Sequence, residues 1–328
     1  MGIGPYDEKI NDNFPHKQIA GNSIYIREKG WYNNRKYPKG GSSMLQDLAY
    51  GRLENEYRPT PPQGSDPVIC VRDSAMLVRQ LKNGTLALPT AAQVFAWCGG
   101  WEKWYDEALQ YAFRLHGVNY YLWLGRSGTC PEEFTYVPAR QLRYSASRTL
   151  CYAAMTGWHL YQWYRSSRFC GRCSEKTVHD EKERMMRCPN CGNMIFPRIN
   201  PAVIVGVTDG DRILMTKYAG RGYTNYALIA GFTEIGETME QTVAREVMEE
   251  VGLQVKNIRY YKSQPWGIDG NILMGFYCDL DGADDIRLDE NELALAQWHH
   301  RKALPIDDDG HSLTREMIRV FGEGNEPK

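Results

Sequence analysis

Hydrophobic and polar residues follow two different periods along the chain, and together they predict a mixture of strands and helices. Short runs rich in β-branched and aromatic residues, bounded by turn-forming residues, are typical of strands. They cover residues 67–71, 118–124, 202–207, 212–217, 226–230, 259–263, 272–278 and 295–299. Apolar residues spaced three or four apart predict helices. These cover residues 91–98, 101–116, 146–165, 239–251 and 312–321.

The order of these elements predicts a division of the chain into four parts. Residues 1–65 are rich in Gly, Pro, Asn and Tyr with weak periodicity, so we expect an irregular segment. Residues 66–165 mix both periods, which indicates an α+β domain. Residues 166–196 carry a cysteine cluster. In residues 197–328 a hairpin and further strands accompany two helices, which predicts an α/β/α sandwich.

The segment from Gly231 to Leu253 reads GFTEIGETMEQTVAREVMEEVGL and concentrates the chemistry. Thr238 with Gln241 three residues later forms a capping box, and a glycine at 252 suits the position just past a helix. On the helix between them, three glutamates spaced i, i+3 and i+4 share one face. They are Glu246, Glu249 and Glu250. Crowded carboxylates repel one another unless a cation lies among them, which indicates Mg²⁺ or Mn²⁺.

This segment matches every defined position of the pattern G-x5-E-x7-R-E-U-x-E-E-x-G-U, where U is apolar. The pattern is the Nudix box, so the chain resembles the Nudix hydrolases, which cleave a nucleoside diphosphate linked to another group. The alternative is a solvated acidic helix with ordinary surface pairs. That alternative explains neither the flanking glycines Gly231 and Gly252 nor Arg245.

Four cysteines form a second motif, two C-x2-C pairs separated by fourteen residues. They are Cys170, Cys173, Cys188 and Cys191. Two tight turns with two thiolates each can close a tetrahedral Zn²⁺ site. A redox pair is the alternative for either half alone. Four thiolates leave no open coordination position, so we expect a structural zinc.

Composition narrows the class of protein. Of 328 residues, 42% are hydrophobic and 24% charged, and the formal net charge is −1. A near-neutral chain has no global field to attract nucleic acid or an anionic membrane. We see neither a signal peptide nor an apolar run near the ~18 residues of a membrane span. These features lead us to expect a cytoplasmic protein.

Three features around the box resemble the NADH pyrophosphatase branch of the Nudix hydrolases. A zinc ribbon precedes the domain, FPRINPAVIVGV leads out of it, and SQPW follows the box. The chain departs from the branch where Gly267-Ile268-Asp269-Gly270 replaces the usual PFP and Ser. Phe196 also replaces the usual tyrosine before Pro-Arg. A late Ser-Ile-Ala also becomes Ser312-Leu313-Thr314. The first and the last of these departures bear on how the nicotinamide half is held.

The resemblance implies roles for the residues of the box. Glu246 and Glu250 are then direct Mg²⁺ or Mn²⁺ ligands, with Glu249 as a ligand or base. The backbone carbonyl of Ala230 adds a ligand, and Glu292 completes the site from an opposite strand. A plain surface glutamate is the alternative for Glu292. The remaining box residues are structural, and among them Glu237 and Arg245 pair to hold the loop around the helix.

The resemblance also implies a substrate pocket outside the glutamates. Phe232 is placed to stack on a base or nicotinamide ring, and a core phenylalanine is the alternative. The other pocket residues are Phe196, Ser263, Gln264, Pro265 and Trp266.

The leading hypothesis is hydrolysis of NADH or NAD⁺ to AMP and nicotinamide mononucleotide. Because the bond is identical, the hypothesis extends to removing NAD caps from RNA. One alternative is a Nudix hydrolase for ADP-ribose or a nucleotide sugar. Another is a zinc-ribbon nucleic-acid-binding or regulatory protein with an inactive Nudix domain, which predicts loss of box carboxylates. The resemblance further implies a homodimer.

Overall fold

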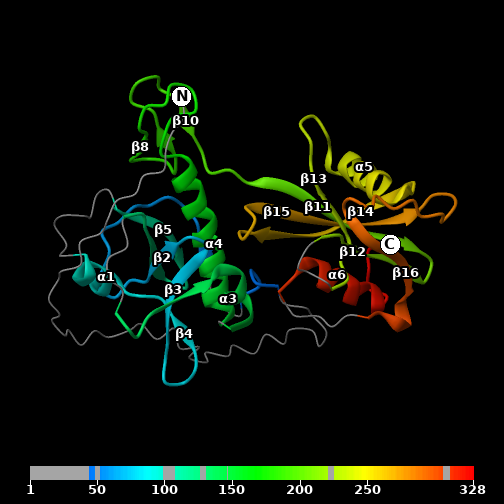
Figure 1. Cartoon of the computed structure of the whole chain (residues 1–328), viewed down its shortest axis with the longest axis horizontal. Coiled ribbons are helices and arrows are strands. Elements are labelled where there is room, and N and C mark those ends of the chain that lie inside the picture. Colours follow the sequence, from blue (N-terminus) through cyan, green and yellow to red (C-terminus); the bar gives the residue numbers. More distant parts are fainter. Residues whose placement is uncertain are drawn as a thin grey trace.

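The computed structural model describes residues 44–48, 52–98, 108–125, 131–145, 147–220, 225–305 and 311–328. Within them the chain forms an N-terminal α+β part, a small three-stranded ribbon and a C-terminal layered part (Figure 1). None of the described helices combines the length and apolar character needed to cross a membrane.

The N-terminal part is a mixed sheet with helices on both faces. Its described strands run in the order β1-β5-β6-β2-β3-β4, and β7 pairs with β3. They are β1 (Leu53–Glu54), β2 (Val68–Arg72), β3 (Ala75–Gln80), β4 (Leu86–Ala87), β5 (Leu109–Leu115), β6 (Val118–Trp123) and β7 (Thr135–Pro138). The helices are α1 (Ala91–Trp97), α3 (Ala139–Ser145) and α4 (Arg148–Ser166).

Alternation along β2 explains this layering. Ile69 and Val71 pack with α4, whereas Val68 and Cys70 pack with α1, because successive strand side chains point to opposite faces. Gly157 lets α4 approach the sheet closely. A Cβ at that position would lie 2.1 Å from Cδ1 of Ile69.

The helix expected over residues 101–116 is wrong for its second half. Residues 109–115 form strand β5, which pairs with β1 and β6, and residues 101–107 lie outside the described residues. Nearly every residue of β5 is buried. A short, almost continuous apolar run does not distinguish a buried strand from a buried helix by its period.

The ribbon is a three-stranded sheet in the order β10-β9-β8. Its strands are β8 (Val178–His179), β9 (Met186–Arg187) and β10 (Met194–Ile195). Two-residue strands bury too little apolar surface to be stable alone. The stability of this part therefore depends on the four cysteines, two before β8 and two between β9 and β10.

The C-terminal part is an α/β/α sandwich, as expected. Its strands run in the order β14-β15-β11-β12-β16, and β13 pairs with β11. They are β11 (Asn200–Asp209), β12 (Arg212–Tyr218), β13 (Ile229–Phe232), β14 (Val255–Trp266), β15 (Asn271–Leu280) and β16 (Leu293–His300). The helices are α5 (Met239–Val251), the short 3-10 helix η1 (Arg301–Ala303) and α6 (Leu313–Gly322).

Alternate residues of β11 face the two covering helices. Val203 and Val205 pack with Val243 and Val247 of α5, whereas Ile204 packs in the cluster that contains α6. Figure 1 shows α5 and α6 on opposite sides of this sheet. The arrangement brings Gly231 of β13 against Glu246 in α5.

Candidate functional site

Helix α5 begins and ends where local sequence signals predict. The Oγ1 of Thr238 accepts from the backbone N–H of Gln241 at 3.2 Å, and Oε1 of Gln241 accepts from the backbone N–H of Thr238 at 2.8 Å. The helix ends at Gly252, whose φ of 70° lies in the left-handed region. The capping-box and C-cap predictions are therefore confirmed.

Gly231 is a glycine because the carboxylate of Glu246 fills the space beside it. A Cβ at position 231 would lie 1.9 Å from Cδ of Glu246. Gly231 stands in β13 opposite Val203, on the face of the sheet that packs against α5. The box glycine thus seats a box glutamate directly against the sheet backbone.

Arg245 joins the loop before α5 to the glutamates on it. Its Nε donates to Oε1 of Glu237 at 2.6 Å, and its Nη2 donates to the carbonyl of Phe232 at 2.9 Å. Its Nη1 donates to Oε1 of Glu246 at 2.8 Å and to Oε2 of Glu249 at 2.9 Å. The expected Glu237–Arg245 pair is confirmed, and the contacts to the two other glutamates were not anticipated.

Hydrogen bonds from Arg245 lower the pKa of Glu237 to about 2, and the backbone N–H of Glu234 contributes to the same shift. Glu237 is therefore ionised across the physiological range. The same contacts raise the pKa of Arg245. The Glu237–Arg245 ion pair holds the loop in place around the start of α5.

The three helical glutamates lie on one face but differ in burial. Glu246 and Glu250 are buried, at 8% and 3% exposure, whereas Glu249 is exposed. Burial raises the pKa of Glu246, Arg245 opposes this, and the charges of Glu249 and Glu292 raise the pKa further. Glu292 is thus close enough to act on Glu246, although it lies in the turn before β16 and not within a strand.

This donor set suits a divalent cation. One oxygen each of Glu246 and Glu249 bonds Arg245, which leaves the second oxygen outside that ion pair. Burial is the main cause of the raised pKa of Glu246, because it disfavours the charged carboxylate unless an opposite charge compensates it. A hard cation with oxygen ligands supplies such compensation.

The two aromatic candidates for ring stacking are solvent-accessible. Phe232 is 53% exposed at the end of β13, and Phe196 is 51% exposed in the linker after β10. Phe232 is therefore not a core residue, which removes the alternative considered for it. The linker reaches β11 at Asn200, two residues before Ala202, the residue that pairs with Phe232.

The SQPW residues occupy the end of β14, and their side chains have different surroundings. Gln264 is fully buried, donates to the carbonyl of His311 at 2.8 Å, and accepts from the backbone N–H of Leu313 at 2.9 Å. Both of its amide atoms hold the start of α6, so the expectation that it lines the nucleotide pocket is corrected to a structural role. Ser263 and Trp266 are half-buried, and Pro265 is exposed.

The sequence departure after SQPW forms a turn that contacts the N-terminal part. Nε1 of Trp158 in α4 donates to the carbonyl of Ile268 at 3.1 Å. Arg140 forms an ion pair with Asp269. A Cβ on Gly267 would lie 2.3 Å from the carbonyl oxygen of Met155, so only glycine fits there. These contacts were missed because each partner lies more than a hundred residues away.

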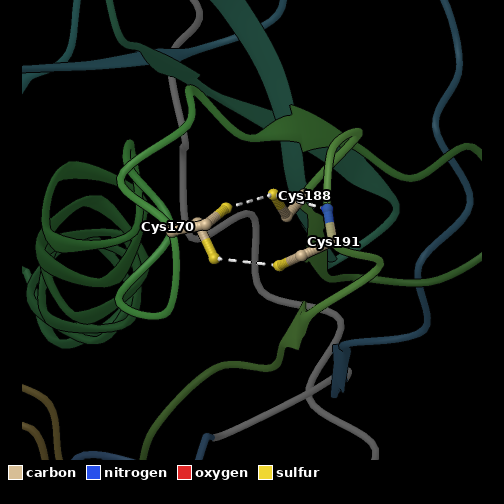
Figure 2. Close-up of side chains that lie close together, drawn as sticks. Cys170, Cys188 and Cys191 are labelled. Carbon is tan, nitrogen blue, oxygen red and sulfur yellow. Dashed lines mark hydrogen bonds between the residues drawn. The ribbon is translucent and has the colours of Figure 1, made fainter.

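The four ribbon cysteines converge as expected. Their sulfur atoms all lie within 4.8 Å of one another. The Sγ atoms of Cys170 and Cys191 are 3.6 Å apart (Figure 2). Those of Cys173 and Cys188 are 3.4 Å apart. Sulfurs on a tetrahedral zinc with bonds of about 2.3 Å are separated by roughly 3.8 Å. The cluster has the dimensions of a Cys₄ metal site.

A backbone hydrogen bond prepares one of these thiols for a metal. The N–H of Arg172 donates to Sγ of Cys170 at 3.4 Å and lowers the pKa of that thiol to about 6. The thiolate is the form that binds metal.

Comparison with known proteins follows the same division of the chain. Residues 198–321 match the family described as NUDIX domain, and residues 165–196 match the NADH pyrophosphatase zinc ribbon domain. A protein of Photorhabdus laumondii named NAD-capped RNA hydrolase NudC is 36% identical over 53% of this chain and 67% of its own length. The chain belongs to the Nudix family.

The chain is also similar to two further proteins. A NAD-capped RNA hydrolase NudC of Pectobacterium atrosepticum is 42% identical over 49% of this chain and 62% of its own length. The Nudix chain thus spans about two thirds of the length of these relatives. A crystal structure of a NUDIX hydrolase from Nitrosomonas europaea covers 48% of this chain and 91% of its own, with 23% identity and a TM-score of 0.41.

Proposed function

We propose that this Nudix protein hydrolyses the pyrophosphate bond of NADH and NAD⁺ and also removes NAD caps from RNA. The observation that carries the proposal is the box itself, in which Glu246 and Glu250 are buried, Glu246 lies against Gly231, and Arg245 fixes the surrounding loop. The zinc ribbon and the names of the relatives support the NAD branch. The products are AMP and nicotinamide mononucleotide, or a 5′-monophosphate RNA.

Glu246 and Glu250 would hold Mg²⁺ or Mn²⁺, with Glu249, Glu292 and the carbonyl of Ala230 as further ligands. The bound metal supplies charge neutralisation at the phosphate oxygens and a more acidic water. Glu249, the exposed glutamate, would serve either as such a ligand or as the base that accepts the proton of the attacking water. Arg245 orients Glu246 and Glu249 from one guanidinium nitrogen.

Substrate contacts fall to the exposed residues of the pocket set. Phe232 and Phe196 each offer a free ring face for a base or nicotinamide. Ser263, Pro265 and Trp266 would line the far side from β14. In the ribbon, Cys170, Cys173, Cys188 and Cys191 would hold one structural Zn²⁺, which closes all four positions to chemistry. A homodimer is part of the proposal.

Hydrolysis of ADP-ribose or a nucleotide sugar is a second candidate. It is favoured by the turn over residues 267–270, where the chain departs from the NADH pyrophosphatase branch and packs against α4. Because this turn already contacts α4, fewer of its atoms are available to contact a nicotinamide ring.

The proposal is tested by identifying products chromatographically. Purified protein with Mg²⁺ or Mn²⁺ is offered NADH, NAD⁺, ADP-ribose and a nucleotide sugar, with Glu250→Gln as the matched control. We expect AMP and reduced nicotinamide mononucleotide, with NADH turned over fastest, and a loss of at least about 10²-fold in kcat for the variant. Faster turnover of ADP-ribose would replace the substrate assignment. Full activity of a folded Glu250→Gln protein would overturn the site.

A further inference from the structure

A polar cavity of about 780 Å³ lies where α4 meets the start of the Nudix domain. One wall is a face of α4 that includes His159, Gln162 and Arg165. The opposite wall consists of Arg198 in the linker between β10 and β11, Asn200 at the start of β11, and the turn over residues 267–270. Figure 1 shows both α4 and the linker extending from the ribbon, α4 along the N-terminal part and the linker toward β11. None of the catalytic glutamates lines this cavity.

The walls are fixed to each other by contacts between the two parts of the chain. Nε2 of His159 donates to the carbonyl of Arg198 at 2.8 Å, which joins the two walls. Within the second wall, Nδ2 of Asn200 donates to the carbonyl of Gly270 at 3.3 Å. The bond from Trp158 to Ile268 closes the end of the same wall. The cavity is therefore built by tertiary structure before any ligand arrives.

Two guanidinium groups give the cavity its charge. Neither Arg165 nor Arg198 forms an ion pair with any residue that the structure describes. Of the two lining carboxylates, Asp269 is paired with Arg140, which leaves Asp73 as the one set against both arginines. The cavity thus has an excess of positive charge, together with amide donors from Gln162 and Asn200. Guanidinium groups in this setting suit phosphate oxygens.

The cavity lies along the strand that leads to the catalytic site. Asn200 begins β11, and Val203 of the same strand stands opposite Gly231, which seats Glu246. Three residues of strand correspond to about 10 Å. The first two residues of β11 are partly exposed, and they lie at the cavity end of the strand. Nucleotides that follow the cap over this edge of the sheet have a short distance to cover to the cavity, whereas a cleaved dinucleotide has no further phosphate to place there.

From this placement we infer that the cavity binds backbone phosphates of the RNA that follows an NAD cap, with Arg165 and Arg198 as the phosphate contacts. The inference rests on the proposed function, since it concerns the same substrate. A free mononucleotide carries the same phosphate group and is therefore the alternative ligand for this cavity. The protein's near-neutral net charge makes a local site of this kind necessary for holding RNA.

The test compares two double variants that remove the same charge. One is Arg165→Gln with Arg198→Gln. The control is Arg114→Gln with Arg168→Gln, two exposed arginines outside the cavity. For each protein, kcat/KM is measured on short NAD-capped single-stranded RNA and on NADH. We expect the ratio of RNA to NADH to fall on the order of tenfold in the cavity variant and to hold in the control. Equal loss on both substrates, or equal loss in both variants, would overturn the inference.

A binding measurement separates the RNA from a mononucleotide and is independent of turnover. Fluorescence anisotropy in the Glu250→Gln background follows a labelled short 5′-monophosphate RNA, with AMP as competitor. We expect the slope of log affinity against log salt to shrink by about 1.4 when both cavity arginines are removed, because each single-strand contact contributes roughly 0.7. Competition by AMP that depends on the two arginines would assign the cavity to a mononucleotide. An unchanged salt slope would refute the site even where the dinucleotide activity is confirmed, and a changed slope would support it even where that activity fails.

Discussion

At the scale of single residues, one glycine and one arginine hold the glutamates of the site in position. Gly231 leaves the space that the Glu246 carboxylate occupies, and Arg245 contacts Glu237, Glu246 and Glu249 together. The sequence predicted the pairing of Arg245 with Glu237, because both residues belong to one local pattern. It did not predict the shared contacts, since those depend on side-chain geometry around the helix.

Replacing Gly231 with alanine tests the close approach to Glu246. The added Cβ forces the carboxylate aside, so we expect a loss of about 1–3 kcal/mol in the free energy of unfolding. In a Glu246→Ala background the clashing group is absent, and the cost of the same change is expected to fall below about 1 kcal/mol. Urea unfolding of the four proteins of this double-mutant cycle gives the coupling. Additive costs would show that the glycine is needed for another reason.

At the scale of elements, those set by local signals were predicted best. The bounds of α5 are as expected because a capping box and a left-handed glycine both act within a few residues. Strand β5 was mistaken for a helix because its run of apolar residues satisfies both periods, and pairing with β1 and β6 decides between them. The ribbon strands are too short to be recognised from sequence, and the cysteines alone marked that part.

Removal of one cysteine tests whether the ribbon depends on its metal. In Cys188→Ser we expect loss of bound zinc together with a lower Tm, because binding of a structural metal contributes directly to folding. Metal content by mass spectrometry and thermal unfolding are measured on the same sample. Cys278→Ser is the matched control, since Cys278 is buried in β15 away from the cluster. A Cys188→Ser protein with full zinc content would contradict the Cys₄ assignment.

At the scale of the whole molecule, the N-terminal part and the Nudix domain are joined through the turn after SQPW. Trp158, Arg140 and the backbone at Met155 all meet residues 267–270. The described segment Met44–Leu48 adds to this junction. Its Leu45 packs with Met155 and Ile268. The sequence of this turn departs from the NADH pyrophosphatase branch. In the structure these same residues make the contacts that join the two parts.

Replacing Gly267 with alanine tests whether this junction makes the two parts unfold together. In Gly267→Ala the new methyl group meets the carbonyl oxygen of Met155, a backbone atom that cannot turn aside. We expect the junction to open and calorimetry to resolve two thermal transitions where the wild type shows one. The change Ala296→Gly, at a half-buried strand position away from the junction, is the control. A single transition at an unchanged Tm would show that the contact contributes little.

The sequence by itself determined the reaction chemistry, the metal-binding cysteines, the sandwich and the limits of α5. Each of these rests on residues close together in the chain or on a period that local geometry imposes. Only the tertiary structure decided which glutamates are buried, that Gln264 fastens α6, that β5 is a strand, and that the arginines of α4 and the linker face one cavity. Those outcomes depend on contacts between residues far apart in sequence, and their burial and pairing energies are absent until the chain has folded.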